Sequence, residues 1–217
     1  MSDIFSEVDE EVRREQLKKL WERYGNLLIA VCVLIVASVG GWRAYSYWQA
    51  KQAAEAGSAF QSAAALAADG KNKEAEEAFA KLSMTGTSSY RMLAKFREAA
   101  ELARTDVKAS VAMYDQLAGE GSVGSAMQDL AALRAGTLLV DSASYAEIAK
   151  RLEPLAAATR TFRHSARGTL ALAAWKAKDL TAMRKWSDMI LADADSPPGI
   201  RGQIQMLQAL ADSEQKS

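Results

Sequence analysis

The 217-residue chain is electrically balanced, with 27 Lys and Arg against 27 Asp and Glu. A protein that binds nucleic acid or another polyanion needs a basic surface, so the balance predicts no such partner. Three prolines and abundant alanine favour helices over sheet. The single cysteine, Cys32, leaves the chain without an internal disulfide, so packing alone must stabilise its fold.

Residues 1–23 form a charged N-terminal segment. Its apolar residues recur at roughly helical spacing, at Ile4, Phe5, Val8 and Val12, which predicts an amphipathic helix. Two interpretations stay open. The helix lies on a membrane surface or docks on a partner, or it is a solvated helix that only leads into the next segment.

Residues 25–42 contain no charged residue. As a helix this run would be about 27 Å long, close to the hydrocarbon thickness of a bilayer. Aromatic residues, which favour the headgroup zone, flank it at Trp21, Tyr24, Tyr45, Tyr47 and Trp48. We predict a membrane anchor over residues 24–48, with Leu27, Leu28, Ile29, Val31, Val33, Leu34, Ile35, Val36, Val39 and Trp42 as its inserting side chains.

Two other interpretations of the run fit less well. A buried core helix is rarely apolar on every side over about five turns and ringed by tryptophans. A cleaved signal peptide has a short charged region and small residues before its cleavage site. Here the charged segment is long, and bulky Trp42 and Arg43 follow the glycines. An uncleaved anchor is therefore favoured.

Basic residues predict the orientation of the anchor. Only Arg43 and Lys51 follow it closely, whereas Arg13, Arg14, Lys18, Lys19 and Arg23 precede it. Because Lys and Arg are retained on the cytoplasmic side, the N-terminus is expected in the cytoplasm and the C-terminal region outside.

The region after the anchor contains an internal repeat. Segments 74–82, 109–117, 147–155 and 181–189 align with a bulky residue at Phe79, Tyr114, Leu152 and Trp186. Their steps of 35, 38 and 34 residues are the period of a tetratricopeptide-type helix pair. Each segment is interpreted as the second helix of a pair, and Pro154 is expected to kink or interrupt the third.

Alanine-rich first helices are expected before these segments, around residues 53–68, 89–104, 125–140 and 163–178. Small residues at Ala64, Ala99, Ala132 and Ala171 allow close packing, and a helix at 200–210 is expected to cap the stack. The predicted fold is all-α, with one N-terminal transmembrane helix followed by a degenerate tetratricopeptide-like solenoid. The repeat domain spans 49–211, and a polar tail spans 212–217.

We find no catalytic, metal-binding or cofactor-binding constellation in the sequence. His164 is the only histidine, and the favoured interpretation is a helix-end residue that packs or caps. The glycine-rich stretch 119–124 lacks the lysine of a phosphate loop. The chain is therefore predicted to be no enzyme, with no cofactor and no small-molecule substrate.

Two basic pairs are candidates for partner binding. Arg91 and Lys95 are four residues apart on one first helix, and Arg163 and Arg167 are equally spaced on another. Such a strip could hold acidic or C-terminal segments of partner proteins. The alternative, an ordinary charged helix face, is favoured over this hypothesis.

The opening stretch MSDIFSEVDEEVRREQLKKLWERYG, the single anchor, the degenerate repeats and the segment FRHSARGTLALAAWKAKDL at 162–180 together resemble a bacterial family. It is the tetratricopeptide-like family of ancillary subunits of the Sec translocon, in its alphaproteobacterial form. The resemblance implies a single-pass inner-membrane protein whose periplasmic repeats associate with the translocon and with periplasmic chaperones.

The sequence thus favours a non-enzymatic, membrane-anchored protein-binding scaffold, and the resemblance implies a role accessory to the Sec translocon. A scaffold for cell-division or respiratory-complex assembly at the outer face of the inner membrane is the alternative. A cell-wall lyase, the third hypothesis, is disfavoured because no residues remain to build a catalytic domain.

Overall fold

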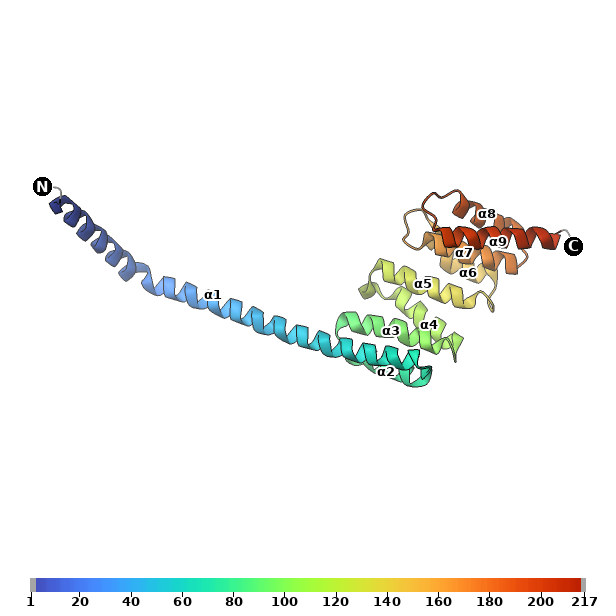
Figure 1. Cartoon of the computed structure of the whole chain (residues 1–217), viewed down its shortest axis with the longest axis horizontal. Coiled ribbons are helices and arrows are strands. Elements are labelled where there is room, and N and C mark those ends of the chain that lie inside the picture. The colour runs from blue at the N-terminus through green and yellow to red at the C-terminus, as the bar shows by residue number, and fades with distance from the viewer. Residues whose placement is uncertain (1–2, 216–217) are drawn as a thin grey trace. The chain divides into compact units, whose positions relative to one another are not determined.

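The computed structural model describes residues 3–215, and within them the side chains of residues 14, 18–19 and 21–214. Regular structure in these residues is entirely helical, which confirms the predicted all-α class (Figure 1). The elements are α1 (Asp3–Ala68), α2 (Asn72–Thr85), α3 (Ser88–Leu102), α4 (Val107–Gly119), η1 (Gly121–Val123), α5 (Ser125–Leu139), α6 (Tyr145–Leu152), η2 (Glu153–Ala156), α7 (Arg163–Lys176), α8 (Leu180–Leu191) and α9 (Pro198–Gln215).

The chain divides into two compact units, Met1–Glu55 and Ala56–Ser217. The first unit consists of the N-terminal part of α1. Its inserting residues, named above, are between 49% and 73% exposed, so no protein surface covers the apolar run. The Ser38 hydroxyl within the run donates to the carbonyl of Leu34 at 2.7 Å, which satisfies this polar group inside the helix.

The described part of the chain thus contains one helix that is long and apolar enough to cross a bilayer. The predicted apolar stripe of Ile4, Phe5, Val8 and Val12 lies outside the described side chains, although the backbone there is helical, within α1. The amphipathic character of this part of the helix stays a prediction.

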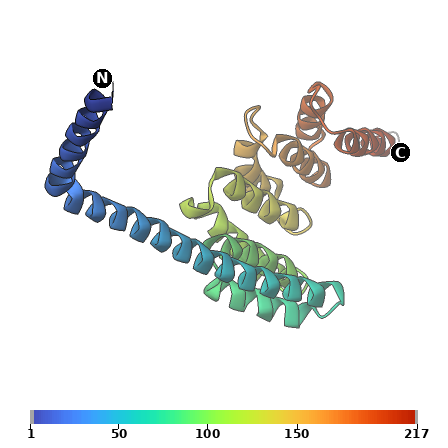
Figure 2. The ribbon, with the colours of Figure 1, turned by 60° about the vertical axis from the view of Figure 1, so that its left-hand side comes forward.

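In the second unit, helices α2 to α9 follow one another in chain order in both views (Figures 1 and 2). Short non-helical segments separate these helices. At the turn after Ala68, Gly70 adopts φ +78°, a left-handed conformation that glycine reaches without strain. Side chains cap the N-termini of three of the second helices. Asp106, Ser144 and Asp179 accept hydrogen bonds from the backbone N–H groups of Ala109, Glu147 and Ala182.

The residues predicted to anchor the repeats are buried. Phe79, Tyr114, Leu152 and Trp186 are at most 4% exposed. They belong to three successive apolar clusters, around Phe79 on α2, Tyr114 on α4, and Leu152 and Trp186 on α6 and α8. Such local, stepwise packing is expected of a repeat protein, in which each repeat contacts its neighbours.

The structure tests two details of the predicted repeats. α6 ends at Leu152, and the chain continues as η2, which contains Pro154 near its start, so the predicted interruption is confirmed. Ala99 and Ala171 are fully buried as predicted. At the other two predicted positions, however, the fully buried alanine lies one residue earlier, at Ala63 and Ala131, whereas Ala64 and Ala132 are only partly buried.

Candidate protein-binding site

α9 occupies the position of a further first helix. The residues of α7 and α9 that line the space between them recur with a spacing of 35 residues: Ser165 and Ile200, Gly168 and Gln203, Thr169 and Ile204, Leu172 and Leu207, and Trp175 and Leu210. Where α7 buries Leu170 and Ala173, α9 has Gln205 and Gln208, which keeps its outer face polar. α9 therefore caps the described stack, as predicted for residues 200–210.

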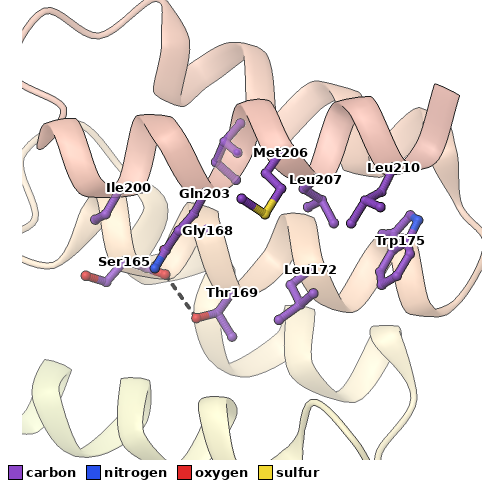
Figure 3. A pocket seen from close by; sticks show the side chains of 11 residues that line it. Ser165, Gly168, Thr169, Leu172, Trp175, Ile200, Gln203, Met206, Leu207 and Leu210 are labelled. Atoms are coloured by element: carbon purple, nitrogen blue, oxygen red, sulfur yellow. Dashed lines mark hydrogen bonds between the residues drawn. The ribbon is translucent and has the colours of Figure 1, made fainter. Parts of the chain in front are cut away.

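Between α7 and α9 lies a groove of about 490 Å³, which we call the α7–α9 groove (Figure 3). It is partly open to solvent, because Met206 is 67% and Leu210 48% exposed. None of the residues that line the groove is charged. The lining residues are Ser165, Gly168, Thr169, Leu172, Trp175, Ile200, Gln203, Ile204, Met206, Leu207 and Leu210.

The polar groups of the groove differ in their availability. The Thr169 hydroxyl donates to the carbonyl of Ser165 at 3.0 Å, within α7. The Gln203 side chain extends from α9 toward Gly168 in Figure 3. Within the described part of the chain, its exposed amide forms no side-chain hydrogen bond, so one donor group and one acceptor remain free at the groove.

A charged cluster at the start of α7 fixes the surrounding helices. Three α7 side chains contact the Asp193 carboxylate, which lies between α8 and α9. Arg163 Nε is 3.1 Å, His164 Nε2 2.9 Å and Arg167 Nη1 3.1 Å from Asp193 Oδ2. These hydrogen bonds, the one from Arg163 first, hold the pKa of Asp193 well below its ordinary value. The same contact raises the pKa of Arg163.

Arg167 is the most buried member of this cluster, with 4% of its surface exposed. Its Nε donates to the carbonyl of Ala156 at 3.0 Å, and its Nη1 to the carbonyl of Met189 at 3.3 Å. A buried guanidinium with these partners connects η2, α7 and α8, which is a structural role.

Arg201 ties α9 to the end of α8 in a similar way. Its guanidinium donates to the carbonyls of Leu191 at 3.1 Å and Ser196 at 3.2 Å, and also to that of Asp193. The Leu191 carbonyl belongs to the last residue of α8, where a helix leaves carbonyls without intrahelical partners, and the other two carbonyls lie in the segment that follows. Both walls of the α7–α9 groove are therefore held by side chains outside it.

The two predicted basic pairs lie in different environments. On α3, Arg91 is exposed and pairs with no other described residue, whereas Lys95 Nζ lies 3.0 Å from Glu120 Oε2 and lowers the pKa of that carboxyl. On α7, Arg163 is paired with Asp193 and Asp195, and Arg167 is buried. Partner binding by Arg91, Lys95, Arg163 and Arg167 stays a prediction.

His164 lies at the second position of α7, is 9% exposed and contacts Asp193, so it is a packed helix-end residue as expected. Among the described residues, no three His, Cys, Asp or Glu side chains are grouped to hold a metal ion. The α7–α9 groove was not predicted. Its signal is present in the sequence, because continuing the repeat by 35 residues aligns Leu172 with Leu207.

The arrangement of a long apolar helix and stacked antiparallel helix pairs defines a helical repeat protein. The chain belongs to the family of tetratricopeptide repeat-like domains, which matches residues 18–180, three quarters of its length. Repeats of this type typically form protein-interaction scaffolds. The match ends at Leu180, the first residue of α8, so the α9 wall of the groove lies outside it. No curated protein and no solved structure is significantly similar to the chain.

Proposed function

We propose that the protein is a non-enzymatic, membrane-anchored scaffold that binds proteins through its helical repeats. The observation that carries this proposal is the exposure of the large apolar side chains from Leu27 to Trp42, each 49% to 73% exposed, in a chain whose repeat unit buries three apolar clusters. Water solvates such a run poorly, whereas a bilayer solvates it well. The run is then a single-pass anchor.

The N-terminus is cytoplasmic and the repeats are periplasmic in this proposal, which rests on the distribution of basic residues around the run. An anchor confines the repeats to the membrane surface and raises the local concentration of a membrane-bound partner, so modest affinity at one site is sufficient. The resemblance of residues 1–25 and 162–180 to ancillary Sec subunits favours the Sec translocon and periplasmic chaperones as partners.

Co-purification tests the translocon role. The full-length chain, tagged at its C-terminus and expressed at native level, is extracted with mild detergent and isolated. We expect the channel subunits of the translocon to co-purify with the chain. The control is a tagged single-pass protein with an unrelated outer domain, which should not co-purify with these subunits. Recovery of the chain without the channel would contradict the translocon role.

Crosslinking in living cells separates the translocon from the alternative clients. A photoreactive amino acid in place of exposed Arg91 should give adducts with translocon subunits or periplasmic chaperones. Adducts with cell-division or respiratory-assembly proteins, in place of these, would support the alternative scaffold instead.

A further inference from the structure

We propose that α1 binds an anionic phospholipid in a hollow at the C-terminal end of its apolar run. The inference rests on the proposed membrane anchor and names a ligand that the anchor selects from the surrounding bilayer. Three observations support it: an exposed cation without a carboxylate, a hollow that leads from this cation toward the apolar run, and a second cation farther out on the same face.

Arg43 is the cation at the hollow. It is the first charged residue after the apolar run, and its side chain is exposed. Within the described part of the chain it has no hydrogen bond or ion pair, and the sequence contains no Asp or Glu between Glu22 and Glu55. A guanidinium at the edge of the hydrocarbon is costly to desolvate unless an anion pairs with it. Because arginine binds phosphate through paired N–H donors, a lipid phosphodiester suits Arg43.

The hollow leads from Arg43 toward the apolar run. It is lined by Gly40, Arg43, Ala44, Ser46 and Tyr47. A Cβ at Gly40 would meet no atom within 4 Å, so the helix backbone is accessible there. Gly40 lies about 4.5 Å closer to the bilayer centre than Arg43, which is the direction that an acyl chain takes from its phosphate. One lipid can therefore contact Arg43 through its phosphate and Gly40 through its acyl chain.

The aromatic residues on the opposite face of α1 already contact one another. The rings of Tyr45 and Trp48 are 6.2 Å apart, and Gln49 Nε2 donates to the Tyr45 hydroxyl at 3.1 Å. Tyr47, which borders the hollow, has no such partner among the described residues. We therefore expect selective lipid binding on the face of the hollow and not on the face of Tyr45.

A second basic residue favours a headgroup without a positive charge. Lys51 lies one turn beyond Tyr47 on the same face, about 12 Å farther along the helix axis than Arg43. It repels the ammonium of phosphatidylethanolamine, whereas the glycerol headgroup of phosphatidylglycerol is uncharged. Arg43 also disfavours a second copy of the chain in the hollow, because two guanidinium groups would then meet without a carboxylate.

Site-directed crosslinking of the full-length chain in lipid nanodiscs tests the inference. The nanodiscs contain equal amounts of phosphatidylglycerol and phosphatidylethanolamine with identical acyl chains. Benzoylphenylalanine replaces Tyr47 beside the hollow or, in a second preparation, Tyr45, about 160° away around the helix. Mass spectrometry identifies the lipid adducts. We expect about fivefold more phosphatidylglycerol than phosphatidylethanolamine adducts at position 47, and nearly equal amounts at position 45.

Two variants locate the site. Arg43→Gln removes the cation and should lower the adduct ratio at position 47 to that at position 45. Gly40→Leu fills the hollow and should also lower the ratio. The matched control is Gly41→Leu, since Gly41 is equally open but does not line the hollow, and the ratio should stay unchanged. Leucine favours both helix formation and membrane insertion, so the glycine variants should stay in the membrane, which carbonate extraction verifies.

Four results would overturn the inference. The first two are equal adduct ratios at positions 47 and 45 of the wild type, and an unchanged ratio in Arg43→Gln. Adducts with a second copy of the chain in place of lipid would make the hollow a helix–helix interface. Loss of the lipid adducts in excess glycerol 3-phosphate, where we expect them to persist, would make it a site for free anions. Failure of the proposed anchor is distinct, because the wild-type chain would then leave the membrane fraction on carbonate extraction.

Discussion

The apolar run of α1 and the helix α7 contain the same residue types in opposite surroundings. Leu34, near the middle of the run, is 68% exposed, whereas Leu170 on α7 is fully buried. α7 reaches this state by packing on neighbouring helices, while the large apolar side chains of the run are exposed. Apolar content therefore does not distinguish a core helix from a proposed anchor in this chain. What distinguishes them is whether neighbouring helices cover the apolar side chains.

A charge in the apolar run should have the largest effect. Leu34→Arg replaces a favourable residue by one that costs about 3 kcal/mol at the centre of a membrane helix, against roughly −3 to −5 kcal/mol for the whole run. Because insertion is then close to break-even, we expect a clearly larger fraction of the variant than of the wild type to leave the membrane fraction on carbonate extraction. Met84→Arg, on exposed α2 surface, is the control and should stay membrane-bound. Full retention of Leu34→Arg in the membrane would remove the distinction between the two regions.

Truncation within α7 should separate buried from exposed leucine. Leu170→Ala opens a cavity in the core and should lower the free energy of unfolding by about 2–5 kcal/mol. Leu172→Ala, two residues away and 38% exposed, should cost less than about 1.5 kcal/mol because less surface and no enclosed cavity are involved. Chemical denaturation of the full-length variants in detergent measures both. Equal losses would show that α7 is not packed as described.

Alanine substitutions at two glycines on first helices should change stability by smaller amounts and in opposite directions. A Cβ at Gly136 on α5 would lie 2.8 Å from the buried side chain of Leu152, so Gly136→Ala should destabilise by about 1–3 kcal/mol. Gly168→Ala enters open space and should stabilise α7 by about 0.5–1 kcal/mol. Thermal unfolding of both variants checks the signs, and destabilisation by Gly168→Ala would indicate a closed groove.

The Asp193 cluster should give a pH-dependent effect. Because contacts hold the pKa of Asp193 below its unfolded value of about 3.9, its contribution to stability is fully present above about pH 4 and declines as the pH falls further. The melting temperature of Asp193→Asn should therefore lie below that of the wild type at pH 7, by a difference that shrinks below pH 4. Asp195→Asn, on an exposed residue, is the control and should show less change. A difference independent of pH would contradict the ionic contacts.

Much of the fold was predictable because each repeat signal is local. The bulky residues Phe79, Tyr114 and Trp186 mark the cores of successive repeats, and the capping residues Asp106 and Asp179 mark helix starts. The period and the boundaries follow from such features within about 35 residues of sequence. The interruption at Pro154 was predictable for the same reason, since proline lacks a backbone donor.

The features that were not predicted depend on residues far apart in the sequence. Arg167 resembles any basic residue on a helix face, and only the distant partners Ala156, Met189 and Asp193 explain its burial. The α7–α9 groove likewise requires knowledge that α9 continues the first-helix series, although α9 lacks the alanine-rich composition of α7. Local patterns predict elements, whereas sites between elements require the packing.

The topology of the chain in a bacterial inner membrane is the most direct test of the proposed anchor. Different epitope tags are placed at the two ends of the full-length chain, and protease is added to spheroplasts. We expect loss of the C-terminal tag and protection of the N-terminal tag, which becomes accessible only after the membrane is broken. Protection of the C-terminal tag in intact spheroplasts would contradict the proposed orientation and, with it, binding of periplasmic partners by the repeats.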